Sequence, residues 1–342
     1  MKLREKIPYI LLCVFALSQL LLLLSKISNS IADGINRTVC VYVRGFISAI
    51  TSIFPFSIFE LIILLSPIAV ILAVVYIIRG EKRIRQRFFA LISVISLFPS
   101  LYVFTLGISY NTTGINVEYG EVKNEDLVSA ARLLSERIST CAPDESEAQK
   151  LSEYRENFSK IYPGICHGYG LRMINLPKPK PLLTSKLMCN IGTLAFYSYP
   201  TAEVNINTDI PEYMQPFTVA HEYAHLLGAA SEAEANFLAY LACEASENQY
   251  IYYSGSLSAL EYLLSDIRKI DVEMYTEVYK TLPQNAKDDL EASRIFFERY
   301  KGSFLYRMAD RLNSAHLEIS DSHGAYSYSV FSRYVTHHLL SA

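Results

Sequence analysis

Residues 217–243 read FTVAHEYAHLLGAASEAEANFLAYLAC, and this stretch decides how the chain is interpreted. Its two halves have the apolar spacing of helices, and Gly228 stands between them where a first helix would end. The first half contains His221, Glu222 and His225. Residues four apart lie on one face of a helix, so both imidazoles can reach a single metal ion. The stretch therefore predicts a tight helix-turn-helix that binds a metal.

The H-E-x-x-H pattern at residues 221–225 is typical of zinc hydrolases. Bound Zn²⁺ lowers the pKa of a coordinated water to about 7. Glu222 lies about 100° around the helix from His221, where it can hold that water and take its proton. The pentapeptide can arise by chance in a chain with seven histidines, but the apolar run at residues 216–227 fits a helix buried beneath a cleft. We therefore expect His221 and His225 to bind Zn²⁺ and Glu222 to act as the general base.

A catalytic zinc normally has three protein ligands, and two carboxylates compete for the third position. Ser231 and Glu234 have the spacing of a capping box, which gives Glu234 a structural role. Glu232 is then the expected third ligand, and Asn236, one turn later, is expected to hydrogen-bond a ligand imidazole. Two alternatives stay open at this point. Glu234 could be the ligand, or neither acid could be, since both favour a helix N-terminus through its dipole.

The pattern E-x-x-A-N at residues 232–236 resembles the second-helix signature of the gluzincins, whose third zinc ligand is a Glu with Asp or Asn four residues later. The gap of six residues between His225 and Glu232 is much shorter than in most gluzincins. Position 231 is Ser, where a metzincin would have its third His. The pattern therefore disfavours the metzincins.

The chain also resembles a bacterial family of membrane proteins classed as domain of unknown function 3810. The likeness lies in a hydrophobic N-terminal region, in a segment like GTLAFYSYPTAEVNIN (residues 192–207), and in the two helices that follow. It implies a zinc site and a membrane topology but no substrate. The family also has a Ser-Tyr pair like the one in HGAYSYSV near the C-terminus, which makes Tyr328 the candidate for stabilising an oxyanion.

Three apolar runs stand in the first third of the chain, at residues 7–24, 58–78 and 88–108. Each is close to the roughly 20 residues that a helix needs to cross a bilayer. They predict three transmembrane helices, with the lipid bilayer as a partner. Residues 39–56 are expected to form an amphipathic helix at the outer membrane surface instead of a fourth span, because Arg44 interrupts the run.

Basic residues indicate the orientation of these spans. Lys2, Arg4 and Lys6 precede the first, and five Lys and Arg residues fill residues 79–87 between the second and third. Both segments are expected in the cytoplasm, so three crossings would place residues 111–342 outside it. We expect a membrane region at residues 1–110 and an extracytoplasmic domain at residues 111–342. Residues 110–342 carry a net charge of −10, which argues against a nucleic-acid partner.

The predicted fold class is α+β and mostly α, with a helix-rich zincin-like domain that contains a small β-sheet. Helices are expected at residues 124–140, 145–162, 256–270, 285–301 and 325–340, a loop at 167–181 and strands within 193–207. An edge strand above the site could pair with an extended substrate, although a plain structural hairpin fits the sequence equally well. Four cysteines in this domain could form two disulfides in an oxidising compartment, and none is assigned to metal.

These features predict a membrane-anchored zinc metallopeptidase that hydrolyses peptides or proteins through a metal-activated water. A non-catalytic zinc-binding receptor or scaffold is the alternative. A membrane assembly factor, in which the spans carry the function, is a third interpretation. An intact Glu222 mildly favours the enzyme, since a purely structural zinc site has no need of a base.

Overall fold

The computed structural model describes residues 3–79, 84–115, 117, 122–141, 150–309, 311–312 and 327–341. These residues are mostly helical, with one three-stranded sheet. The chain divides into two compact units. The N-terminal unit comprises Met1–Thr113 and Ser198–Glu203, and the C-terminal unit comprises Gly114–Tyr197 and Val204–Ala342.

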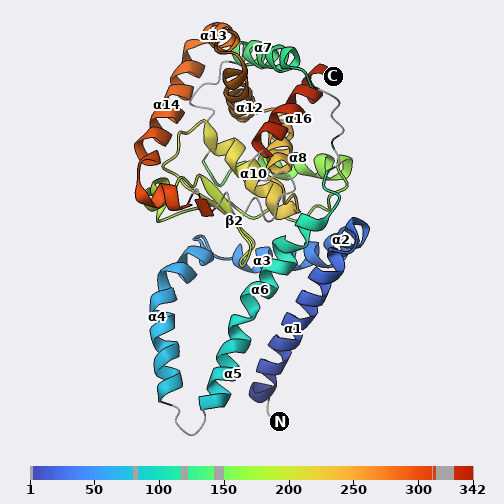
Figure 1. Ribbon diagram of the computed structural model, residues 1–342, viewed down its shortest axis with the longest axis vertical. Helices are drawn as coiled ribbons and strands as arrows, with labels where there is room; N and C mark the ends of the chain where they lie inside the picture. The colour runs from blue at the N-terminus through green and yellow to red at the C-terminus, as the bar shows by residue number, and fades with distance from the viewer. Residues whose placement is uncertain are drawn as a thin grey trace. The chain divides into compact units, whose positions relative to one another are not determined.

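Three helices in the N-terminal unit are long and apolar enough to cross a membrane: Lys6–Ser25, Ile58–Ile78 and Ile84–Gly107. They match the three predicted spans to within a few residues. The first belongs to α1 (Leu3–Ser25) and the second is α4 (Ile58–Ile78), while the third combines α5 (Ile84–Ile95), α6 (Leu97–Tyr102) and the π-helical turn η3 (Val103–Gly107) (Figure 1). No residue in the most apolar part of α4 is buried within the protein, as expected of a helix that is surrounded by lipid.

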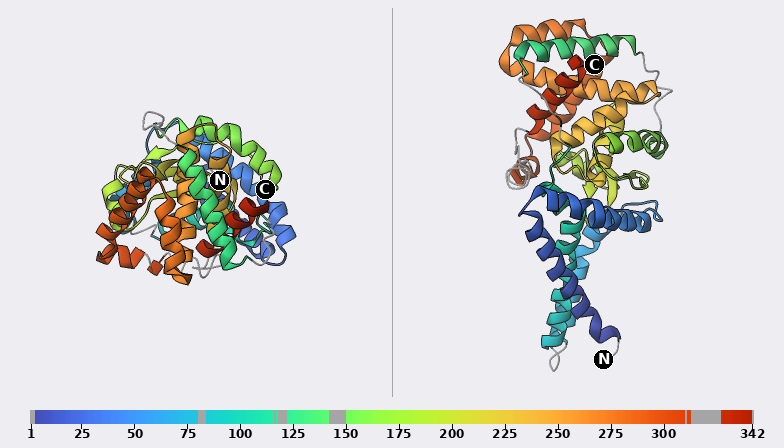
Figure 2. Two further views of the ribbon diagram at one scale, coloured as in Figure 1. Left: turned by 90° about the horizontal axis from the view of Figure 1, so that it is seen from above. Right: turned by 90° about the vertical axis from the view of Figure 1, so that its right-hand side faces the viewer.

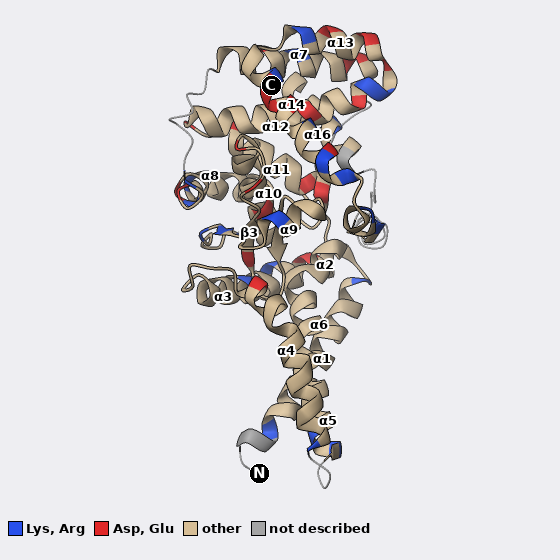
Figure 3. Cartoon of the chain, turned by 90° about the vertical axis from the view of Figure 1, so that its left-hand side faces the viewer, with Lys and Arg blue, Asp and Glu red and all other residues tan. Residues whose placement is uncertain are grey.

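The membrane-type helices of this unit pack side by side. α1 contacts α5 and α6, and α4 contacts α5 (Figure 2). Lys and Arg residues stand at the start of α1 and at the start of α5, which lie at the same end of the bundle, and the rest of these helices has almost no charged residues (Figure 3). This is the charge distribution on which the predicted orientation rests.

The connection from α1 to α4 consists of α2 (Asn29–Ile35), the π-helical turn η1 (Asn36–Cys40) and α3 (Val41–Thr51). The buried face of α3 is largely polar and its exposed face is apolar. Arg44 is 1% exposed and donates to Oδ1 of Asn36 at 2.9 Å. The helix predicted within residues 39–56 is therefore present as α3, and Arg44, which interrupts its apolar run, turns its side chain inward.

The N-terminal unit also includes the turn between two strands of the sheet, Ser198–Glu203. The sheet has the order β1-β3-β2, with β1 (Lys180–Pro181), β2 (Ala195–Ser198) and β3 (Glu203–Ile206). β1 runs parallel to β3, with Lys180 opposite Asn205. Strands within residues 193–207 are thus confirmed. The predicted loop at 167–181 is wrong at both ends, because α8 extends to Gly168 and residues 180–181 form β1.

The remaining helices belong to the C-terminal unit. They are α7 (Asn124–Thr140), α8 (Tyr154–Gly168), α9 (Ser185–Asn190), α10 (Met214–Leu227), α11 (Glu232–Glu244), α12 (Gln249–Ile270), α13 (Val272–Thr281), α14 (Gln284–Lys301) and α16 (Ser327–Ser341). α7 has the predicted bounds. The second predicted helix starts later than expected, since residues 151–153 form a turn and residues 142–149 lie outside the described part of the chain.

The core of this unit surrounds α10 and α11, which pack on each other and on α12, while α11 also contacts α16. Two buried tyrosines fix α10 to its neighbours. Tyr162 of α8 donates its hydroxyl to the carbonyl of Ala220 at 2.5 Å, and Tyr223 of α10 donates to the carbonyl of Pro177 at 2.6 Å. The helix that carries the H-E-x-x-H pattern is therefore held on both sides.

Candidate metal centre

The turn between α10 and α11 brings the two halves of the quoted stretch together. Gly228 ends α10 with a left-handed backbone (φ 114°), and the amides of Gly228 and Ala229 both bond the carbonyl of Ala224. Such a C-cap reverses the chain within very few residues. Ser231 is then extended, and α11 begins at Glu232. The short gap that distinguishes this chain from most gluzincins is thus a compact reversal that returns Glu232 toward the histidines.

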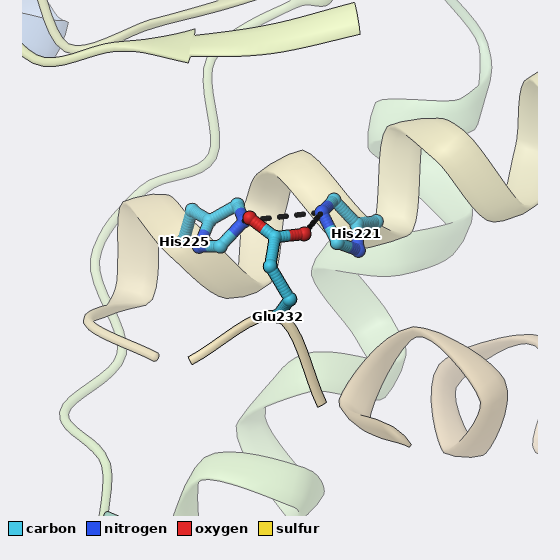
Figure 4. Close-up of side chains that lie close together, drawn as sticks. All are labelled: His221, His225 and Glu232. Atoms are coloured by element: carbon cyan, nitrogen blue, oxygen red, sulfur yellow. Dashed lines mark hydrogen bonds and ion pairs between the residues drawn. The ribbon is translucent and has the colours of Figure 1, made fainter. Parts of the chain in front are cut away.

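Three side chains converge at this reversal. Nε2 of His221 and Nε2 of His225 lie 3.0 Å apart, and oxygens of Glu232 lie 3.4 Å and 3.6 Å from them (Figure 4). Within the described part of the chain, this is the group of His, Cys, Asp or Glu side chains that could hold a metal. Ligand atoms about 2.0–2.1 Å from a tetrahedral zinc are about 3.3–3.4 Å apart. The three separations fit that requirement.

The outer nitrogens of both imidazoles face oxygens that can only accept hydrogen bonds. Nδ1 of His221 lies 2.8 Å from Oδ1 of Asn236, and Nδ1 of His225 lies 2.7 Å from the carbonyl of Ala229. In the neutral imidazoles each Nδ1 therefore carries the proton and donates it, which leaves a lone pair on each Nε2. Two lone pairs and a carboxylate then face one point, and such a donor set suits a cation. The predicted contact of Asn236 with a ligand imidazole is confirmed.

The charges of the cluster are strongly coupled. Burial opposes the charge on Glu232, but hydrogen bonds with His221 and His225 outweigh this and hold the pKa of Glu232 well below its ordinary value. Burial likewise opposes a charged His225, yet the hydrogen bond and charge of Glu232 raise the pKa of His225 to about 9. The carboxylate thus stabilises positive charge at the nitrogens, whether a proton or a metal ion supplies it.

Glu222 lies beside the cluster on α10 and is 5% exposed. Burial raises the pKa of the Glu222 carboxyl, while the two histidines and a hydrogen bond from the backbone of Tyr197 in β2 oppose the rise. A carboxylate with a raised pKa is better matched to accepting a proton near neutral pH than an exposed one. The arrangement can therefore supply a base next to a metal ion.

Glu234 takes no part in the cluster. Its carboxylate accepts a hydrogen bond from the amide of Ile115 at 3.1 Å. Ser231 is the N-cap residue of α11, but its side chain makes no capping bond. The predicted capping box is therefore wrong, because Glu234 turns toward the segment at Gly114, where a Cβ would lie 2.0 Å from its Oε1. Glu234 is structural, through a contact that the spacing did not indicate.

Tyr328 lies in the first turn of α16, and its side chain is outside the described residues. The six cysteines, Cys13, Cys40, Cys141, Cys166, Cys189 and Cys243, are all free.

A polar cluster that was not predicted joins three helices. Glu244 of α11 bonds Arg137 of α7 and lies 2.7 Å from Nε2 of His338 on α16. The spacing of residues so far apart in the chain offers no signal for it.

A protein-family model described as "Protein of unknown function (DUF3810)" matches residues 36–336. The chain belongs to the DUF3810 family. In this DUF3810 protein the match includes α4, the third membrane-type helix and all the candidate metal ligands, and it begins after α1. Comparisons with the curated proteins and with the solved structures found no match. The resemblance to the DUF3810 family is confirmed, whereas the gluzincin signature stays a prediction.

Proposed function

We propose that this protein is a membrane-anchored zinc metallopeptidase. His221, His225 and Glu232 would hold the Zn²⁺, and Glu222 would be the general base. The observation that carries the proposal is the convergence of two imidazole lone pairs and one carboxylate next to a buried glutamate. When bound, zinc would polarise a substrate carbonyl and lower the pKa of water.

The residues around the cluster would each have a defined task. Asn236 and the carbonyl of Ala229 fix the tautomer and the orientation of the two imidazoles. Glu222 would take a proton from the attacking water and pass it to the leaving amine. A structural zinc site uses four protein ligands, whereas three leave one position for water or substrate. This favours a catalytic site.

The sheet supports a peptide as the substrate class. β2 stands at one edge of the sheet order, and the backbone of its Tyr197 lies close enough to Glu222 to lower the pKa of that carboxyl. An extended chain can add to a sheet alongside an edge strand. A peptide bound along β2 would therefore lie next to the proposed base. A purely structural hairpin is the competing interpretation of the same strands.

Localisation follows from the spans and their charges. Three apolar helices and basic residues at the starts of α1 and α5 favour an anchor whose C-terminal unit lies outside the cytoplasm. We therefore propose extracytoplasmic peptides or proteins as substrates. The acidic character of residues 110–342 gives no reason to expect a nucleic acid.

The test uses the full-length protein in lipid nanodiscs, loaded with one equivalent of zinc and incubated with a peptide library. Glu222→Gln should reduce hydrolysis by roughly 10²–10⁴-fold with zinc content unchanged, because it removes only the base. Glu247→Gln, the same change at an exposed acid of the C-terminal unit, is the matched control and should leave hydrolysis unchanged. A zinc-loaded wild-type protein that cleaves no peptide would favour the receptor or scaffold.

A further inference from the structure

The turn that joins β2 to β3 ends in a glutamate with no exposed surface, Glu203. Both oxygens of its carboxylate accept backbone hydrogen bonds from the start of α4. The amide of Ile58 donates to Oε1 at 3.0 Å, and the amide of Phe59 donates to Oε2 at 2.9 Å. The hydroxyl of Thr201 also donates to Oε2, at 2.7 Å. The carboxylate is thus engaged on both oxygens.

These bonds complete the cap of a membrane-type helix. The first amides of any helix lack partners within it, and they carry partial positive charge. Ser57 accepts the amide of Glu60 at 3.0 Å, which leaves the amides of Ile58 and Phe59 to Glu203. Charge-assisted hydrogen bonds of this kind are about twice as strong as neutral ones. The start of α4 therefore depends on a residue more than 140 positions later in the chain.

The rest of the turn is fixed in the same unit. The hydroxyl of Thr51 donates to the carbonyl of Thr201 at 2.9 Å, and the rings of Tyr199 and Tyr102 meet edge to face at 5.4 Å. Ala202 has a left-handed backbone (φ 47°), a conformation that strains a non-glycine residue and persists only where surrounding contacts impose it. The turn is therefore held firmly against the helices of the N-terminal unit.

The other end of this short hairpin reaches the candidate base. Tyr197 directly precedes the turn, and its backbone lies close enough to Glu222 to lower the pKa of that carboxyl. β2 and β3 are neighbours in the sheet and are joined by four residues, so they form a hairpin. One continuous element thus bonds the start of α4 at its turn and has Tyr197 beside Glu222 in its strand.

We propose that Glu203 is a positioning residue: by bonding the start of α4 it holds the β2–β3 hairpin in place, and with it the strand beside Glu222. A change at the start of α4 that releases Glu203 would then shift the strand next to the base. The catalytic meaning of this link rests on the proposed function, whereas the link itself is a property of the hairpin.

The test is hydrogen–deuterium exchange on the full-length protein in nanodiscs. Glu203→Gln should speed exchange about tenfold or more at residues 58–60 and also at Ala195–Ser198, because a charge-assisted cap is lost, while α12 stays protected. Ser57→Ala is the matched control, since it removes one cap bond of α4 without touching the hairpin. It should speed exchange at the start of α4 alone.

Two outcomes would overturn the proposal. One is that Glu203→Gln affects only residues 58–60 and leaves β2 as in the wild type. The other applies if Glu203→Gln does not fold. Thr51→Val then removes the hydrogen bond from Thr51 to the Thr201 carbonyl and keeps the cap of α4, and unchanged exchange at β2 in that variant would also contradict the proposal. Should β2 respond while no variant hydrolyses any peptide, the proposed function fails and the link stands. In an active enzyme, Glu203→Gln should lower kcat with zinc content and KM unchanged.

Discussion

Oδ1 of Asn236 lies 2.8 Å from Nδ1 of His221, one turn along the helix from Glu232. This bond fixes the imidazole in the tautomer that leaves Nε2 free for a metal. Asn236→Ala should weaken zinc binding by about 10–100-fold, the usual effect of removing such a partner. Asn236→Asp keeps an acceptor and should retain most of the affinity. Competition with a chromophoric chelator measures both, and equal affinities for wild type and Asn236→Ala would contradict the assignment.

Glu232 and Glu234 provide a second test, because the structure gives them different partners. Glu232→Ala should abolish stoichiometric zinc binding by the full-length protein, since two imidazoles alone make a weak site. Glu234→Ala should keep about one zinc per chain, although it loses the bond to the Ile115 amide. Elemental analysis of the two purified variants decides between them. Zinc lost from Glu234→Ala and kept by Glu232→Ala would reverse the assignment.

Helix packing behind the site leads to a third prediction. A Cβ at Gly255 of α12 would lie 2.2 Å from the Cβ of Cys243 on α11. Gly255→Ala should therefore lower the free energy of unfolding by about 1–3 kcal/mol through overpacking. Gly164→Ala in α8 is the matched control, because nothing lies within 4 Å of its Cβ position. It should raise stability by about 0.5–1 kcal/mol. Thermal melts that rank the two variants in the opposite order would contradict the packing.

Acid stability tests the cluster around Glu244. Burial opposes its charge, but hydrogen bonds from His338 and Arg137 outweigh this and lower the pKa of Glu244 to about 2. A carboxyl with a lowered pKa stabilises the fold above its unfolded pKa of roughly 4.3, and loses that contribution as the pH falls toward 2. Glu244→Gln should therefore be less stable than wild type at pH 7, and the difference should shrink between about pH 4.3 and 2.

That comparison is best made on metal-free protein, so that release of zinc in acid does not contribute. His338→Ala should shift stability in the same direction by a smaller amount, because the bond from Arg137 remains. Thermal melts across the pH series measure the effect. A difference between Glu244→Gln and wild type that stays constant from pH 7 to pH 2 would exclude this role for Glu244.

The elements that sequence predicted well have a local, periodic signal. The three apolar helices and the pair α10 and α11 follow from runs of side chains whose spacing alone decides their environment. The contact of Asn236 with His221 could be predicted for the same reason, since helical spacing puts Asn236 on the face of Glu232. These predictions needed no knowledge of the rest of the chain.

What the sequence did not reveal depends on partners far away or on the backbone. Glu234 bonds the amide of Ile115, 119 residues earlier, so its capping spacing was misleading. The carbonyl of Ala229 contacts His225 and the backbone of Tyr197 lies close to Glu222, and main-chain groups such as these are present at every residue, so the sequence does not single them out. The inward turn of Arg44 could not be predicted either, because the oxygen of Asn36 that accepts from it faces it only after folding.

The placement of Ser198–Glu203 with the N-terminal unit means that the chain has no single point at which it can be cut. A fragment that starts near residue 111 would keep Glu203 but lose the amides of Ile58 and Phe59, and would leave a buried carboxylate and the strained Ala202 without support. The two units are therefore not interchangeable modules. Grafting the C-terminal unit onto another anchor would require a redesigned turn, and in related proteins we expect the turn and the start of α4 to change together.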